Sequence, residues 1–313
     1  MPWLSGKAAP AISNALGRRV PSVACLACRA RTRSFSSPGA DNNVDLDKSV
    51  AWVVGGAGVI GSGICRGLLR AGATVILSSR KPEKLASIEK HLGYPTNLIT
   101  LEGTMLPEGI DALLQRALGH PELNGRLIKH VVAHNGVRWW ATGGDHDETS
   151  LMSTTDKMTL LNMDTTTFSS YSMRLPSLHH SAAQYLMPLL MRVPNASYTF
   201  VTGGAGLRRG PIDQVNTQCI WGFIEALREE LRGCPVTLQE LRVSLEINRL
   251  AKERELDPRP TPLSHDIGDI CAGMALNLKG WRPPTTYYPI TNHQDILYLK
   301  AKYPTNEIHN HIG

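Results

Sequence analysis

A glycine-dense turn between an apolar run and a helical pattern constrains this chain more than any other feature. Residues 51–80 read AWVVGGAGVIGSGICRGLLRAGATVILSSR, and the turn holds Gly55, Gly58 and Gly61. Glycine lets backbone N–H groups approach a ligand closely, because no Cβ stands in the way. The start of the following helix adds unpaired N–H donors and a positive dipole end. The segment therefore predicts a strand, a phosphate-cradling turn, a helix and a second strand.

From residue 50 onward, apolar runs alternate with helical patterns. This alternation predicts a parallel sheet with crossover helices. The expected strands are 50–54, 74–78, 97–101, 129–133, 197–202 and 236–243, with a last strand around 286–290. The expected helices are 60–71, 82–92, 107–118, 151–172, 179–193, 213–232 and 266–278. The fold class is therefore predicted to be α/β: a Rossmann-type doubly wound parallel sheet in three αβα layers, forming a single domain over 41–313.

The position of the turn, with a strand before it and a helix after it, favours dinucleotide binding over a chance glycine pattern. The backbone of the turn and of the first helical residues is expected to contact the cofactor. These predicted contact residues are Gly55, Gly58, Val59, Ile60 and Gly61. The alternative is a scaffold of the same fold that no longer binds a nucleotide.

The end of the second strand distinguishes between the two nicotinamide cofactors. Sites for NAD usually place an acidic residue there to hold the ribose 2′-hydroxyl, whereas an arginine accommodates a 2′-phosphate. This chain has Ser79 and Arg80 and no acid at that point. NADP(H) is therefore predicted in preference to NAD(H). The alternative is that Arg80 and Lys81 are two solvated cations at the start of a helix and do not distinguish NADP(H) from NAD(H).

The first 40 residues differ in composition from the rest of the 313-residue chain. They contain six of its 33 basic residues and none of its 27 acidic ones, and they are rich in Ser and Ala. This composition predicts a disordered transit peptide over 1–40 and a mitochondrial matrix location, with a plastid as the alternative. The remaining 27 basic residues balance the 27 acidic ones. A formally neutral body argues against a nucleic-acid partner, and no apolar run is long enough for a membrane span.

Over about residues 50–243 the chain resembles the short-chain dehydrogenase/reductase family. The sequence VAHNG at 132–136 stands where that family has Asn-Asn-Ala-Gly after its fourth strand. The resemblance implies that Asn135 and Gly136 line the cofactor site and that Asn162 supports a proton-relay water. It also implies that Glu102 lies near the adenine.

The chain departs from the family at the catalytic positions. The family's Ser position falls on Gly203, with Thr202 one place earlier, and the Tyr and Lys positions fall on Asp213 and Thr217. In the family, the Lys lowers the pKa of the Tyr so that the phenol can exchange a proton at neutral pH. An Asp and a Thr reproduce neither role. A Tyr-x-x-x-Lys at 298–302 lies beyond the sixth strand and is interpreted as a coincidence.

Two functions follow from these residues. The first is an NADP(H)-dependent oxidoreductase for a small carbonyl or alcohol, with an altered proton relay that uses Asn162, Thr202 and Asp213. The second is a catalytically inactive nucleotide-binding or regulatory subunit of the same fold, in which Asp213 is only a charge near a helix N-terminus. The resemblance also implies a homodimer through helices 179–193 and 213–232.

No metal site is predicted from the cysteines and histidines. Cys25 and Cys28 form a Cys-x-x-Cys without a second pair, inside the expected transit peptide. The histidines at 179–180 and 309–311 lack companion ligands at the required spacing and are expected to be exposed to solvent.

Overall fold

Seven parallel strands form the central sheet of this chain. In the computed structural model they are β1 (Val50–Val54), β2 (Thr74–Ser79), β3 (Leu98–Glu102), β4 (Ile128–Ala133), β5 (Ser197–Gly203), β6 (Thr237–Val243) and β7 (Tyr287–Ile290). The structure describes residues 46, 48–134, 160–203, 211–245, 247, 263–277 and 287–305, with only the backbone of 211–213, all within the unit Asp41–Gly313. The strand order is β3-β2-β1-β4-β5-β6-β7, and every neighbouring pair is parallel. This order confirms the predicted doubly wound α/β fold.

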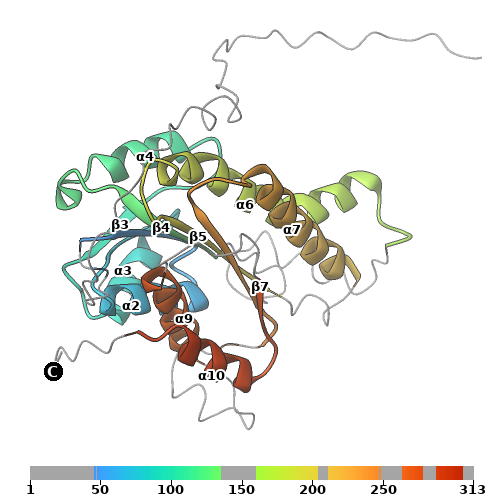
Figure 1. Cartoon of the computed structure of the whole chain (residues 1–313). Coiled ribbons are helices and arrows are strands. Elements are labelled where there is room, and N and C mark those ends of the chain that lie inside the picture. Colours follow the sequence, from blue (N-terminus) through green and yellow to red (C-terminus); the bar gives the residue numbers. More distant parts are fainter. Residues whose placement is uncertain are drawn as a thin grey trace, which may run out of the picture. The chain divides into compact units, whose positions relative to one another are not determined.

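Helices cover both faces of the sheet (Figure 1). One face packs against α2 (Val59–Arg70), α3 (Pro82–His91), α9 (Ser264–Leu276) and α10 (His293–Lys302). The other packs against α4 (Ile110–Leu118), α6 (Thr165–Leu190) and α7 (Pro211–Glu230), with the short 3₁₀ helix η1 (Pro121–Leu123) before β4. The predicted three layers are therefore confirmed.

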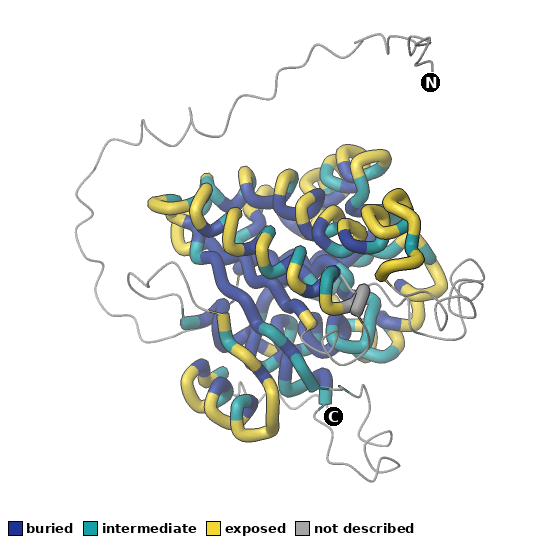
Figure 2. The backbone as a smooth tube through the Cα atoms, turned by 90° about the vertical axis from the view of Figure 1, so that its right-hand side faces the viewer, coloured by how far each residue is buried: buried dark blue, intermediate teal, exposed yellow. Residues whose placement is uncertain are grey.

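The strands are apolar because both of their faces are covered. All five residues of β1 are buried, and so are the first five of β2. Figure 2 shows the strands as a buried centre, whereas the helices expose their outer sides. Continuous apolar runs such as Val50–Val54 are typical of parallel strands that are buried on two sides.

One helix was predicted incorrectly. The sequence suggested two helices, 151–172 and 179–193, whereas the structure has a single 26-residue helix, α6, with Pro176 and Pro188 inside it. The helix continues through Pro176 because its buried stripe continues on both sides, from Ser172 to Leu190. Proline in a helix weakens the local hydrogen bonding, but it does not end a helix whose apolar face is held by tertiary packing.

The N-terminal end of α6 also differs from the prediction. Asp164 caps the helix, because its Oδ1 accepts a hydrogen bond from the Thr167 N–H at 2.9 Å. Residues 160–164 are therefore not helical, and 151–159 lie outside the described residues. Helix α10 and the 3₁₀ helix η1 were not predicted, and the other helices and strands match their predicted ranges to within about three residues.

Helices α2 and α9 cross in direct backbone contact. A Cβ at Gly268 would lie 1.9 Å from the Gly63 carbonyl oxygen, and one at Gly67 would lie 2.3 Å from the Gly268 oxygen. No other residue fits at these positions without moving a helix. The crossing fixes α2, and with it the glycine turn that precedes α2. No described helix is both long enough and apolar enough to span a membrane.

Candidate dinucleotide-binding site

The glycine turn follows β1 directly, and its glycines have different roles. Gly55 has a φ of 77°, a left-handed conformation that favours glycine. A Cβ at Gly61 would lie 2.2 Å from the Gly55 carbonyl oxygen and 2.7 Å from the Gly56 Cα, so only glycine lets α2 pack this closely on the turn. Gly58 is less confined, since a Cβ added at this position would contact only the Gly55 carbonyl oxygen, at 3.5 Å.

The start of α2 is suited to an anion. Its N-cap is Gly58, no side chain caps the helix, and its first turn contains no acidic residue. Backbone N–H groups at a helix start bind phosphate when no side chain competes for them. Val59, Ile60 and Gly61, which were predicted to contact the cofactor, form this first turn.

The end of β2 lies beside the same edge of the sheet. Ser79 pairs with Glu102 at the end of β3, and the Ser79 hydroxyl accepts a hydrogen bond from the Lys81 N–H at 3.2 Å. Arg80 follows as an exposed residue in a bend before α3. Glu102 is exposed as well, and its carbonyl oxygen accepts a hydrogen bond from the Arg116 guanidinium. Arg80 is thus exposed to solvent at the end of β2, as a cofactor-contacting residue at this position must be.

His134 occupies the carboxyl end of β4, and sequence reasoning assigned it no role. Its backbone N–H donates a hydrogen bond at 2.9 Å to the carbonyl oxygen of Val54, the last residue before the glycine turn. Its ring Nδ1 lies 3.2 Å from the carbonyl oxygen of Val201 on β5, and the residue is partly buried. The signal that could have found it is a histidine at the end of a central strand. Asn135 and Gly136 follow immediately, but they lie outside the described residues.

The predicted catalytic residues are in different surroundings. Thr202 is buried on β5, and its hydroxyl donates to Oε1 of Glu240 at 3.2 Å. Asn162 is exposed in a turn before α6 rather than on a helix as expected. Asp213 is in the first turn of α7, where the structure describes only the backbone, and Thr217 is buried one turn further on. The structure thus leaves the roles of Asn162, Thr202 and Asp213 as predictions.

A buried ionic cluster joins β6 to α7. The Glu240 carboxylate is fully buried and accepts four hydrogen bonds: from Thr202, from Arg228 Nη2 at 3.0 Å, and from Arg242 Nε and Nη2 at 2.8 and 3.1 Å. Glu225 pairs with both arginines from its exposed position on α7. The cluster is formally neutral, because it contains two carboxylates and two guanidinium groups.

Two aromatic rings enclose the Arg242 guanidinium. It lies 4.3 Å from the ring centroid of Trp221 on α7 and 4.0 Å from that of Tyr287 on β7. Cation–π contacts of this kind add to the salt bridges when the cation is shielded from water. The cluster therefore ties α7 to the two strands at this edge of the sheet.

The histidines do not form a metal site in the described part of the chain, where no suitable group of ligands is found. His180 is exposed as expected, but His179 is buried, with its ring 5.5 Å from that of Phe200. The expectation of exposure was wrong for His179, because the stripe of α6 that faces the sheet passes through it. His309 and His311 lie outside the described residues.

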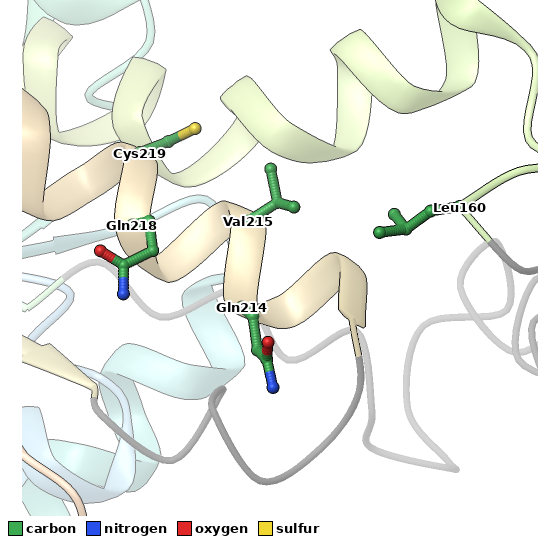
Figure 3. Close-up of a pocket in the computed structure, with 5 residues that line it drawn as sticks. All are labelled: Leu160, Gln214, Val215, Gln218 and Cys219. Atoms are coloured by element: carbon green, nitrogen blue, oxygen red, sulfur yellow. The ribbon is translucent and has the colours of Figure 1, made fainter.

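A hollow of about 490 Å³ lies on the outer side of α7. Figure 3 shows the Leu160 side chain pointing toward α7 across this hollow. The other residues that line it are Gln214, Val215, Gln218 and Cys219. None of these five residues was predicted as a site residue.

Comparison with known proteins agrees with this geometry. Residues 51–108 match the family described as NADP oxidoreductase, coenzyme F420-dependent. This region runs from β1 past the glycine turn and β3, so the match covers the candidate pyrophosphate site and the end of β2. No curated protein matches the chain in sequence.

Solved structures resemble the chain over most of its length. The RhlG/NADP active-site complex of Pseudomonas aeruginosa has a TM-score of 0.58 and 20% identity, covering 79% of this chain and 96% of that one. An apo short-chain oxidoreductase of Pseudomonas aeruginosa PAO1, described as containing an atypical catalytic centre, has a TM-score of 0.58 and 18% identity, covering 79% and 97%. A short-chain dehydrogenase/reductase of Brucella melitensis has a TM-score of 0.55 and 16% identity, covering 78% and 95%. The fold of this chain is therefore that of the short-chain dehydrogenase/reductase structures.

Proposed function

We propose that this protein binds NADP(H) across the carboxyl ends of β1 and β4 and acts as an oxidoreductase on a small carbonyl or alcohol. The observation that supports this proposal most strongly is the glycine turn. Gly61 allows α2 to pack against Gly55, and the N-terminus of α2 is left without a side-chain cap. In doubly wound sheets, ligands bind at the point where the strand order reverses, which here lies between β1 and β4.

Each part of the predicted cofactor site has a defined task in this proposal. The backbone of Gly58 to Gly61 holds the pyrophosphate, and Arg80 holds the 2′-phosphate through charge-assisted hydrogen bonds. Asn135 and Gly136 line the cofactor beyond β4. When bound, the nicotinamide supplies hydride chemistry, and the protein orients it and excludes water. The match of 51–108 to an NADP oxidoreductase family supports the same assignment.

An acidic N-cap provides the sharpest test of the turn. Aspartate is a favourable N-cap, and Gly58 has an extended backbone that any residue adopts, with φ −83° and ψ 177°. Gly58→Asp should therefore keep the fold, while its charge repels the pyrophosphate. We expect the affinity for NADPH and for NADH, measured by fluorescence titration of the full chain, to fall by about 100-fold or more. This corresponds to roughly 3 kcal/mol of binding free energy, from lost hydrogen bonds to the pyrophosphate and from charge repulsion. Gly58→Asn is the neutral control of the same shape. Equal affinities of the two variants would contradict the assignment.

The preference for NADP(H) is tested at Arg80. Loss of a hydrogen-bonded charge costs about 1.5–3 kcal/mol, so Arg80→Ala should weaken NADPH binding about 10- to 100-fold and leave NADH binding nearly unchanged. Lys84→Ala, which removes an exposed cation in the first turn of α3, is the control. Equal losses for both cofactors in Arg80→Ala would remove the argument for the 2′-phosphate.

A second function, nucleotide binding without catalysis, is favoured by one specific observation. The family's Ser, Tyr and Lys positions hold Gly203, Asp213 and Thr217, and the neighbouring Thr202 hydroxyl is bonded to Glu240. NADP(H) would then act by stabilising the fold. Binding of NADPH without oxidation of NADPH by any member of a carbonyl panel would support this second function. Turnover that Asp213→Asn abolishes would support the enzyme.

We also propose that residues 1–40 direct the protein to the mitochondrial matrix. The support is their composition, with arginines and no acid. A fusion of 1–40 to a fluorescent protein should enter mitochondria, and the variant with Arg18→Glu and Arg19→Glu should remain in the cytosol. Accumulation in plastids would favour the alternative, and a cytosolic wild-type fusion would contradict both.

The homodimer is proposed to form through the outer sides of α6 and α7. Arg174 is the only Lys, Arg, Asp or Glu of α6, and Phe168 and Met173 are 37% and 50% exposed. Interface centres are depleted of charge and enriched in Phe and Met. Light scattering after size exclusion should give twice the chain mass. The variant with Phe168→Glu and Met173→Glu should be monomeric, whereas Leu297→Glu on α10 should not change the mass. A monomeric wild-type protein would overturn this assignment.

A further inference from the structure

We infer that His134 is the proton donor of the site, a role that rests on the proposed function. The inference starts from the position of His134. Its N–H is bonded to the Val54 carbonyl at 2.9 Å, so it lies where β1 and β4 separate and directly beside the glycine turn. Bound ligands lie in this crevice in doubly wound sheets. His134 therefore lies at the edge of the sheet where this fold binds a dinucleotide.

The ring of His134 is held on the side of β5. Its Nδ1 lies 3.2 Å from the Val201 carbonyl oxygen, one residue before Thr202. A carbonyl oxygen only accepts hydrogen bonds, so Nδ1 carries a hydrogen in both the neutral and the protonated ring. Nε2 is consequently the nitrogen that gains and loses the exchangeable proton. The structure thus fixes which atom of His134 does acid–base chemistry.

The other described polar groups near the ends of β5 and β6 are less suited to donating a proton. The Thr202 hydroxyl is directed to Glu240, and an alcohol does not ionise near neutral pH. Glu240 accepts four hydrogen bonds from cationic and hydroxyl donors and has no proton to give. Arginine side chains, such as that of Arg242, are not deprotonated in proteins. Histidine ordinarily titrates near pH 6.5, the range in which general acids work at physiological pH.

The step balances as a two-electron reduction. A reduced nicotinamide dinucleotide, when bound, would supply a hydride to the carbonyl carbon of the substrate and would be left oxidised. The His134 imidazolium gives its Nε2 proton to the carbonyl oxygen, so the C=O π bond is replaced by new C–H and O–H bonds. Neutral His134 then regains a proton from water, while Nδ1 keeps its hydrogen bond to Val201.

Cofactor affinity, kcat, the pH profile of kcat and proton NMR of the full chain test this assignment. His134→Gln should keep NADPH affinity within about threefold, but should lower kcat by roughly 10²–10⁴-fold, the usual contribution of a general acid. It should also remove the ionisation near neutral pH from the kcat profile. His293→Gln, an exposed histidine on α10, is the matched control and should change neither. In proton NMR, the His134 C2–H resonance, assigned by its loss in His134→Gln, should shift when NADP⁺ is added.

The outcomes separate this inference from the proposed function. Binding of NADPH with an unmoved His134 resonance would overturn the role of His134 and leave the cofactor assignment intact. Turnover by His134→Gln with an unchanged pH profile of kcat would likewise overturn the role of His134 and leave the cofactor assignment intact. Absence of NADPH and NADH binding by the wild-type chain would overturn both the proposed function and this inference.

Discussion

Glu240→Gln should destabilise the protein far more than its small change in volume suggests. Glu240 is fully buried and accepts four hydrogen bonds, two at each carboxylate oxygen. The glutamine amide has a single oxygen, so it can keep only two of these bonds, and its NH₂ group must then face two donors. Arg228 and Arg242, with side chains only 2% and 14% exposed, retain only the carboxylate of Glu225. Removing one partner from a buried ion pair costs about 3–5 kcal/mol.

Urea unfolding of the full chain measures this cost, and the chain contains a matched control. Glu229 forms an i,i+3 pair with Arg232, and both side chains are well exposed, at 66% and 72%. Glu229→Gln should therefore lower the free energy of unfolding by about 1 kcal/mol or less. Tryptophan fluorescence would follow the transition, since Trp221 packs on Arg242. Equal midpoints for the two variants would refute the view that the Glu240 cluster holds α7 in place.

Three further predictions concern packing, pH and thiol reactivity. Gly268→Ala forces a Cβ against the backbone of α2 and should lower the free energy of unfolding by about 1–3 kcal/mol or more. Gly222→Ala on α7 places its Cβ in open space and should raise the free energy of unfolding by about 0.5–1 kcal/mol in the same urea assay. The reverse order of the two variants would contradict the close crossing of α2 and α9. Burial lowers the pKa of His130 to about 3, so the unfolded chain protonates first, and stability should fall by up to about 1.4 kcal/mol per pH unit from pH 6.5 toward 3. His130→Gln should flatten that slope, and an unchanged slope would exclude His130 as its source. Burial raises the pKa of the Cys65 and Cys271 thiols, so iodoacetamide should modify them only after unfolding, and mass spectrometry of the native protein would reveal any exception.

The fold was predictable because its signals are local. Apolar runs of five or six residues, such as Val50–Val54, can be buried on both faces only in a parallel sheet, and the helical patterns between them supply the covering layers. The failure at α6 has a physical cause. Pro176 reads as a break in sequence, but packing against the sheet and α7 keeps the helix continuous. The hydrogen bond that a proline removes from a helix can be predicted from the sequence. The tertiary contacts that compensate for its loss cannot.

The glycine turn was predictable for the same reason, since Gly55, Gly58 and Gly61 act within one turn. The surroundings of Thr202 were not, because their interactions join residues that are distant in sequence. Thr202 was predicted to take part in an altered proton relay, and its hydroxyl donates to Glu240, 38 residues later in the chain. Thr202 can donate to a substrate oxygen only by giving up this bond, and Glu240 then loses one of the four donors that keep its charge buried. The His134 ring bonds to Val201 through Nδ1, so this bond is kept when Nε2 exchanges a proton. Strand β5 thus contacts both groups, through the Thr202 hydroxyl that donates to Glu240 and through the Val201 carbonyl oxygen that accepts from His134 Nδ1.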